Sequence, residues 1–254
     1  MGRGPGAGRL RRDLPALGAV PRPAHPDHAG RLRPDRRRGR RQPARQPLRR
    51  TSVNLTLIGS TGHTGRYVLA EALRRGHRVT AFTRNAAALE ARPHAVVEGD
   101  GRDLEKMRTA VADADAVISI INGGDSRDPH RAAEATRTVM RAMAEARVRR
   151  LIVTTPYPIV ARRPFLVLWL LRRLLATQYA DARDLERAVS AGDLDWTIVR
   201  LTRLTDRPAT GAVVIRRELL GMPHALTRAD VAATLLDIAQ EGHLSRVAVN
   251  VNGR

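Results

Sequence analysis

The chain contains no cysteine among its 254 residues, and only 3% of them are aromatic. The absence of cysteine excludes disulfide bonds, thiolate-bound metals and thiol catalysis. It also fits a reducing compartment, so we expect a cytoplasmic protein. No His, Asp or Glu residues are spaced as metal ligands usually are, so we expect no metal site. Hydrophobic residues reach 43%, and aliphatic side chains must therefore fill the core.

Lysine occurs once, at Lys106, and every other cationic side chain is arginine, with a net charge of +20. Fifteen Arg and three Asp fall within residues 1–50, which leaves +8 for residues 51–254. Residues 1–50 are rich in Pro, Gly and Ala and have no apolar periodicity, so they cannot bury enough surface to offset chain entropy. We interpret this basic segment as a disordered leader without a role, which disfavours nucleic acid as a partner; a tail for nucleic acid or an anionic membrane is the alternative.

From residue 51 onwards, short apolar runs alternate with segments of helical periodicity. The runs predict strands at 53–58, 78–83, 95–98, 116–121, 151–155, 196–199, 213–215 and 247–251. The periodic segments predict helices at 64–75, 104–112, 129–146, 165–176, 180–191 and 228–240. This alternation is typical of an α/β fold with a doubly wound parallel sheet, covered on both faces. We therefore expect residues 51–254 to form one Rossmann domain that binds its ligand at the carboxyl ends of the strands.

The most apolar segment is FLVLWLLRRLL, residues 165–175. It is far shorter than the ~20 residues that a membrane-spanning helix needs, so we expect no membrane span. We interpret it as a helix that packs within the domain or at a subunit interface, which leaves a homodimer open. A lid over the substrate or an interfacial membrane contact is less favoured.

A glycine-rich loop follows the first predicted strand and leads directly into the first predicted helix. A glycine at the strand end permits a tight turn, a second lets the backbone approach a pyrophosphate, and a third lets the helix pack close to the sheet. The N–H groups and the positive dipole end of the helix then face the phosphates. The predicted cofactor-binding residues of this loop are Gly59, Ser60, Thr61, Gly62, His63, Thr64 and Gly65.

Three further segments accompany this loop: EGDGRD at 98–103, DWTIVR at 195–200 followed by LTD at 204–206, and TRADVA at 227–232. With the glycine loop, the chain resembles the atypical and extended short-chain dehydrogenases/reductases over nearly all of residues 53–254. It is most similar to the NAD(P)H-binding group that includes biliverdin-IXβ and flavin reductases. The resemblance implies a nicotinamide cofactor, with Asp100 and Gly101 near its adenine. Asp103 is better interpreted as a helix N-cap, and Thr227 with Asp230 as a capping box.

The residue that ends the second strand decides between NADP(H) and NAD(H), because an acidic side chain there would bind the ribose hydroxyls and repel a 2′-phosphate. The sequence at this point is AFTRN, residues 81–85, with no acid. Arg84 can bind a 2′-phosphate through a charge-assisted fork and stack on the adenine. We therefore predict NADP(H), with NAD(H) as the weaker alternative.

The Tyr-x-x-x-Lys pair of typical short-chain dehydrogenases is absent, because Tyr67, Tyr157 and Tyr179 all lack a lysine four residues on. Arg183 follows Tyr179 at that spacing, which we interpret as coincidence, since arginine does not replace lysine equivalently. Alcohol dehydrogenation, epimerisation and dehydration are therefore disfavoured. Hydride transfer from NADPH to a small conjugated acceptor (flavin, quinone or bilin-like) needs orientation above all, and water can supply the proton.

Strand topology places the remaining candidates. Thr155 and Tyr157, after the fifth strand, are the predicted catalytic residues, with Thr154 beside them on the nicotinamide side. Asn122 and Gly123, after the fourth strand, are predicted near the cofactor ribose. The leading hypothesis is an NADPH-dependent oxidoreductase, and the alternative is a non-catalytic NADP(H)-binding sensor or regulator.

Overall fold

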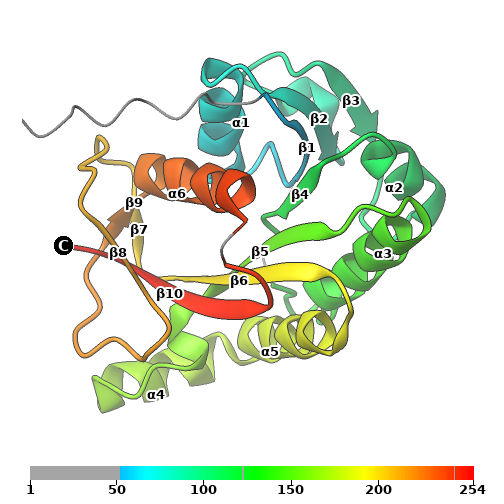
Figure 1. Cartoon of the computed structure of the whole chain (residues 1–254). Helices are drawn as coiled ribbons and strands as arrows, with labels where there is room; N and C mark the ends of the chain where they lie inside the picture. Colours follow the sequence, from blue (N-terminus) through cyan, green and yellow to red (C-terminus); the bar gives the residue numbers. More distant parts are fainter. Residues whose placement is uncertain (1–51, 122, 243) are drawn as a thin grey trace, which may run out of the picture. The chain divides into compact units, whose positions relative to one another are not determined.

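A computed structural model describes residues 52–121, 123–242 and 244–254 of the chain, so the predicted leader lies outside the described residues. One sheet of eight strands runs in the order β3-β2-β1-β4-β5-β6-β10-β8 (Figure 1). Every neighbouring pair is parallel except β10 with β8. The strands are β1 (Asn54–Ile58), β2 (Arg78–Thr83), β3 (Ala95–Glu98), β4 (Ala116–Ser119), β5 (Arg150–Pro156), β6 (Asp195–Leu201), β8 (Val213–Arg216) and β10 (Val247–Gly253). A separate parallel pair joins β7 (Leu204–Thr205) and β9 (Leu226–Thr227).

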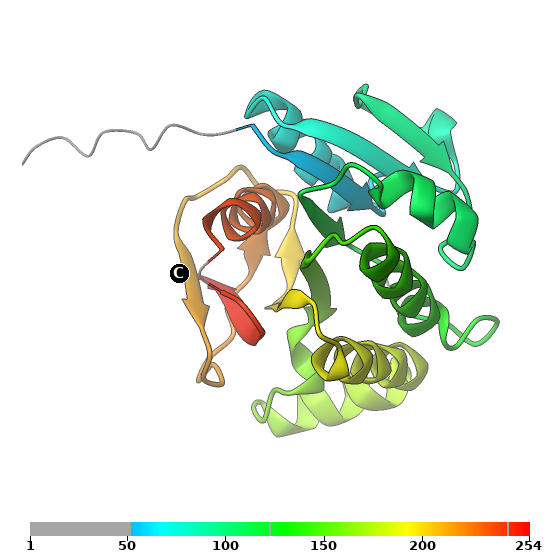
Figure 2. The same ribbon diagram turned by 45° about the vertical axis from the view of Figure 1, so that its right-hand side comes forward.

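Helices cover both faces of the large sheet (Figure 2). They are α1 (Gly65–Arg74), α2 (Leu104–Val111), α3 (Arg131–Glu145), α4 (Phe165–Leu174), α5 (Ala176–Ala191) and α6 (Arg228–Glu241), with 3₁₀ turns at Ala86–Ala88 and Tyr157–Ile159. One buried apolar cluster holds α1 and α6 on one face of the sheet. A second cluster holds α2, α3 and α5 on the other face. The predicted doubly wound α/β fold is therefore confirmed.

The strand order fixes where a ligand can bind. The chain runs from β1 outwards to β2 and β3, then returns to β4 on the other side of β1. Connections that leave in opposite directions open a crevice at the carboxyl ends of β1 and β4, and ligands of such sheets bind there. The glycine loop begins directly after β1, at Gly59.

Helix α4 is expected from the sequence to pack within the domain or at a subunit interface, and the structure contradicts the first of these two expectations. Of its ten residues only Leu168 is buried, and most of its large apolar side chains are exposed. The apolar run does form a helix, but most of that helix is not covered by the rest of the described chain. None of the helices in the described ranges is long and apolar enough to cross a membrane.

Candidate functional site

The glycine loop connects β1 to α1 with backbone packing that excludes larger residues. Gly59 has φ +84°, and a Cβ there would lie 2.3 Å from the carbonyl oxygen of Ile120, after β4. A Cβ on Gly65 would lie 2.0 Å from the carbonyl oxygen of Gly59. These two glycines therefore let the loop turn sharply and let α1 start against it, as the sequence predicts.

The amino end of α1 presents unused hydrogen-bond donors. Within the described ranges, the backbone N–H groups of Thr61, His63 and Thr64 have no intramolecular acceptor. The N-cap residue Thr64 makes no side-chain capping bond, and the first turn carries no acidic residue. Free donors and an uncompensated positive helix end favour an anionic group at this point. The loop therefore fits the pyrophosphate of a dinucleotide.

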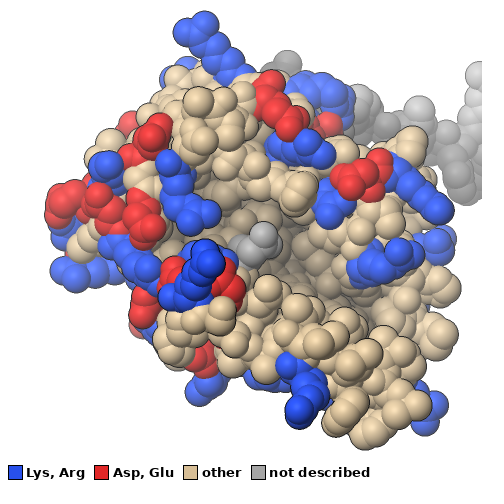
Figure 3. All heavy atoms as spheres, turned by 180° about the vertical axis from the view of Figure 1, so that it is seen from behind, with Lys and Arg blue, Asp and Glu red and all other residues tan. Residues whose placement is uncertain are grey.

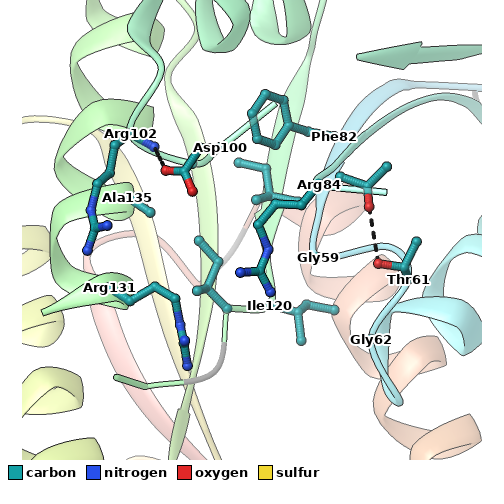
Figure 4. Close-up of a pocket in the computed structure, with 14 residues that line it drawn as sticks. Gly59, Thr61, Gly62, Phe82, Arg84, Asp100, Arg102, Ile120, Arg131 and Ala135 are labelled. Atoms are coloured by element: carbon teal, nitrogen blue, oxygen red, sulfur yellow. Dashed lines mark hydrogen bonds between the residues drawn. The ribbon is translucent and has the colours of Figure 1, made fainter. Parts of the chain in front are cut away.

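A cavity opens beside this loop at the carboxyl ends of β1, β2 and β4. It is lined by Gly59, Thr61 and Gly62 of the loop, by Phe82, Thr83 and Arg84 of the β2 end, by Asp100, Gly101 and Arg102 after β3, and by Ile58, Ile120, Ile121, Arg131 and Ala135. Thr61 and Thr83 are joined through their hydroxyls at 3.1 Å, which ties the loop to the end of β2 (Figure 4). Asp100 faces the cavity and accepts a hydrogen bond of 2.9 Å from the backbone N–H of Arg102.

Three arginines line this cavity, and they differ in their partners. Arg102 forms ion pairs with Asp128 and Glu134. Arg131 pairs with Asp125 at 3.4 Å and donates to the Gly123 carbonyl at 3.0 Å. Arg84 extends into the cavity, and its guanidinium has no acidic or carbonyl partner in the described part of the chain (Figure 4). The uncompensated cation in this cavity is thus the one predicted to select a 2′-phosphate.

A second cavity adjoins the first, sharing Ile120, Ile121 and Arg131 with it. Its wall adds Thr64 and Gly123, Thr154–Pro156 at the end of β5, Leu175, Gln178 and Tyr179 around the start of α5, and Leu201, Thr202 and Leu204 after β6. The two cavities run along the carboxyl edge of the sheet, from the end of β2 to the end of β6. This path suits an extended ligand with phosphates at the glycine loop.

The hydroxyl of Thr155 is already engaged. It donates to Glu186 Oε1 at 2.6 Å, and the same carboxylate accepts two hydrogen bonds from Arg200, on the neighbouring β6. Glu186 and Arg200 are largely buried, with 12% and 17% of their side chains exposed. This network holds the ends of β5 and β6 together under α5, while Thr154 lines the cavity without such a partner.

Tyr157 lies outside both cavities, which corrects the expectation that it lines the nicotinamide side. Its side chain is 1% exposed and packs with Ala161 and Leu168. Its hydroxyl accepts a hydrogen bond from the Leu220 N–H at 2.8 Å and lies 3.2 Å from the Leu220 carbonyl. A 3₁₀ turn begins at Tyr157 and directs the ring towards α4. Tyr157 therefore anchors the segment around Leu220.

Tyr179 lines the second cavity. Burial raises the pKa of its phenol above the usual value, and the nearby positive charge of Arg172 opposes this shift only in part. The phenol is therefore protonated at neutral pH and can donate a hydrogen bond. The cation that influences Tyr179 is Arg172, whereas Arg183, four residues on, is exposed.

Asp181 on α5 is a buried residue that the sequence did not single out. Its carboxylate accepts hydrogen bonds from the N–H groups of Gly124, Ala132 and Ala133, at 2.6, 2.8 and 2.9 Å. It thereby caps α3 and fixes the preceding loop, which carries Gly123. A sequence signal is hard to find, because the carboxylate lies about fifty positions from its donors.

The other predicted residues have varied placements. Ser60 is buried, His63 is exposed and lines neither cavity, and Asn122 lies outside the described residues. Asp103 caps α2 by accepting from the Lys106 N–H. Thr227 caps α6, but Asp230 also accepts from Thr210 and Gly211, and so ties a distant loop to the helix.

Several solved structures share this fold. A short-chain dehydrogenase/reductase from Veillonella parvula in complex with NADP superposes with a TM-score of 0.68 at 19% identity, over 80% of this chain and 95% of that one. ChuY, an anaerobillin reductase from Escherichia coli O157:H7, gives 0.65 at 22% identity, over 79% and 97%. A candidate NADH-flavin reductase from Streptococcus pneumoniae gives 0.68 at 19% identity, over 80% and 100%. At these identities the likeness shows the fold.

Sequence comparisons give the family. The curated protein YwnB of Bacillus subtilis, itself uncharacterized, is 31% identical over 101 residues, and the match spans 40% of this chain and 46% of that protein. This chain therefore matches about half the length of that relative. The family model described as NAD(P)H-binding matches residues 59–242, from the first glycine of the loop to the glycine that follows α6. The chain belongs to this NAD(P)H-binding family, as its glycine loop and the strand order around it indicate.

Proposed function

We propose that the protein is an NADPH-dependent oxidoreductase that reduces a small conjugated acceptor of the flavin, quinone or bilin type. The observation that carries the cofactor preference is Arg84, an unpaired guanidinium in the cavity beside the glycine loop. No acidic residue stands at the end of β2 to repel a 2′-phosphate. We also propose a cytoplasmic location, because a chain without cysteine fits a reducing compartment.

NADPH, when bound, supplies the hydride, and the chain's own residues supply binding and orientation. The free N–H groups after Gly59 would hold the pyrophosphate, and Arg84 the 2′-phosphate. On the acceptor side, Thr154, Thr202 and Tyr179 offer polar groups in a wall of mixed polar and apolar side chains. The protonated phenol of Tyr179 can donate to a carbonyl or ring nitrogen of the acceptor. A catalytic role for Thr155 stays a prediction, and any such role would act through a hydroxyl that is already bonded to Glu186.

The acceptor class is supported by the catalytic groups that hydride transfer to a conjugated ring does not need. Oxidation of an alcohol or reduction of a carbonyl normally depends on a phenol whose pKa a lysine lowers, whereas burial raises the pKa of Tyr179. An electron-poor ring accepts hydride without a strong protein acid, provided that it lies against the cofactor. Two of the solved structures of similar fold are a bilin reductase and a candidate flavin reductase by name.

Arg84→Ala tests the cofactor preference. We expect the dissociation constant for NADPH to rise about tenfold to a hundredfold, because a charge-assisted hydrogen bond contributes about 1.5–3 kcal/mol. The constant for NADH should change little. Titrations followed by nucleotide fluorescence measure both values. Arg78→Ala is the matched control, since Arg78 is an exposed arginine at the opposite end of the same strand. Equal losses for the two nucleotides in Arg84→Ala would contradict a 2′-phosphate site.

The reaction is tested by mixing the full chain with NADPH and, in turn, FMN, a simple quinone and biliverdin. We expect the absorbance of the reduced nicotinamide to decay with at least one acceptor. Tyr179→Phe should raise the KM for that acceptor more than it lowers kcat, because the phenol binds the acceptor and does not carry the hydride. Tight NADPH binding without oxidation by any acceptor would replace this proposal with the non-catalytic sensor.

A further inference from the structure

Helix α4 exposes a large apolar surface. Phe165 is 73% exposed, Leu166 77%, Trp169 57% and Leu174 69%, while only Leu168 of this helix is buried. Isolated exposed apolar residues are ordinary, but a contiguous set of this size marks an interaction surface. We call the following residues the α4 face: Phe165, Leu166, Val167, Trp169, Leu170 and Leu174.

The α4 face is convex and wide. At 100° per residue, its members span an arc of about 200° around the helix axis. The loop around Leu220 extends the α4 face, because Leu220 packs beside Leu168 in one small cluster. Two nearby residues of this loop, Leu219 and Met222, are 41% and 70% exposed. In Figure 3 this surface is the broad area of uncharged atoms at the lower right, bordered by basic side chains. A protein partner would need a deep groove to cover so wide a surface of the helix. The surface of a lipid bilayer, which is fluid, covers it without a preformed groove.

The charge around the α4 face is predominantly positive. Residues 151–180 contain no Asp or Glu. Arg162 and Arg163 stand just before the helix and Arg173 on it, all exposed, and no ion pair is found for them in the described residues. Arg172 instead donates to the carbonyls of Pro158 and Ala161. The adjoining loop adds two arginines, 216 and 217, against one glutamate, 218. An anionic partner complements this border.

We propose that α4 docks the protein onto the surface of an anionic phospholipid bilayer, with the helix lying in the plane of the interface. Ten residues of helix measure about 15 Å, too short to cross the ~30 Å hydrocarbon layer. Phe, Trp and Leu side chains enter the boundary between headgroups and acyl chains, and flanking arginines contact lipid phosphates. Trp169 sits where amphipathic aromatic rings are favoured, at the level of the headgroups.

A second copy of the chain fits the α4 face less well. A two-fold interface places the same patch of both subunits together. It would bring the arginines at 162, 163 and 173 of each copy towards those of the other, with no acidic residue of the same segment to separate them. The net charge of +20 on the whole chain acts in the same direction, favouring an anionic surface over self-association.

The test uses the full chain and vesicles of phosphatidylcholine with or without an equal share of phosphatidylglycerol. The chain has two tryptophans, and Trp196 is 9% exposed, so a change in fluorescence reports mainly on Trp169. We expect anionic vesicles to shift the emission to shorter wavelength, and lipids brominated on their acyl chains to quench it. Vesicle flotation should give a partition coefficient that falls at least about tenfold in the double variant Leu166→Gln/Leu170→Gln.

The double variant leaves every charge in place, including those of residues 1–50, so electrostatic attraction by that segment is unchanged. Val96→Gln is the matched control, because Val96 is an exposed apolar residue on β3, an edge strand of the sheet that is not part of the α4 face. The partition coefficient of Val96→Gln should equal that of the parent chain. Thermal unfolding checks that the variants fold. Partitioning that is unaffected by Leu166→Gln/Leu170→Gln would overturn the proposal, as would an emission shift that depends on protein concentration without vesicles.

Discussion

Gly65→Ala is expected to lower the free energy of unfolding by about 2–4 kcal/mol and to abolish measurable NADPH binding. The added Cβ would lie 2.0 Å from the carbonyl oxygen of Gly59, 2.8 Å from its carbonyl carbon and 2.9 Å from Cα of Ser60. All three are backbone atoms, so no side-chain rotation relieves the clash. The loop and the start of α1 must separate, and the free N–H groups at the amino end of α1, which are proposed to bind the pyrophosphate, then lose their common direction.

Gly221→Ala is the control for this experiment, because nothing lies within 4 Å of a Cβ at Gly221. Denaturant unfolding gives the stability, and nucleotide fluorescence gives the affinity. Gly221→Ala should change neither by more than about 0.5 kcal/mol. If Gly65→Ala bound NADPH as tightly as the parent chain, the close packing of α1 on the loop would not be needed for the site.

The parts of the site that sequence alone could predict are those whose chemistry is local in the chain. The strand, the glycine loop and the following helix are contiguous, so the position of the glycine loop at the start of α1 follows from spacing. The position of Arg84 can likewise be predicted, because this residue directly follows strand β2. The continuous apolar strands also predict a sheet covered on both faces, which fixes the architecture.

The parts that sequence could not predict depend on the direction of a side chain or on contacts between distant segments. Tyr157 follows the right strand, and the prolines at 156 and 158 indicate a turn there, but they do not tell that the 3₁₀ turn points the ring into the interior. Thr155 meets Glu186 across 31 positions. The apolar sequence of α4 predicts a helix correctly, yet nothing in it tells whether another part of the domain covers that helix. The short pair of β7 with β9 was also missed, because two-residue strands have no periodicity.

Asp181→Ala is expected to lower the free energy of unfolding by about 3–5 kcal/mol. The buried carboxylate accepts from Ala132 and Ala133, at the second and third positions of α3. An N-cap side chain normally binds these donors, but the N-cap residue here, His130, makes no such bond. The variant leaves those donors and the Gly124 N–H buried without an acceptor, and removes a negative charge from the positive end of the helix.

Asp181→Asn keeps one of the two acceptor oxygens, so the amide can still accept from Gly124 and Ala132, but its NH2 group then faces the Ala133 N–H. We expect a loss smaller than that of Asp181→Ala, about 1–3 kcal/mol. Asp184→Ala is the matched control, because Asp184 lies one turn along α5 and forms surface pairs with Arg187 and, at 4.0 Å, with His130, together worth at most about 1 kcal/mol. NADPH affinity should fall in Asp181→Ala but not in Asp184→Ala, because the loop that Asp181 fixes carries Gly123 and leads to Arg131. If both alanine variants lost the same small stability, water would have to satisfy the α3 donors. The cap would then have no part in holding the wall shared by the two cavities.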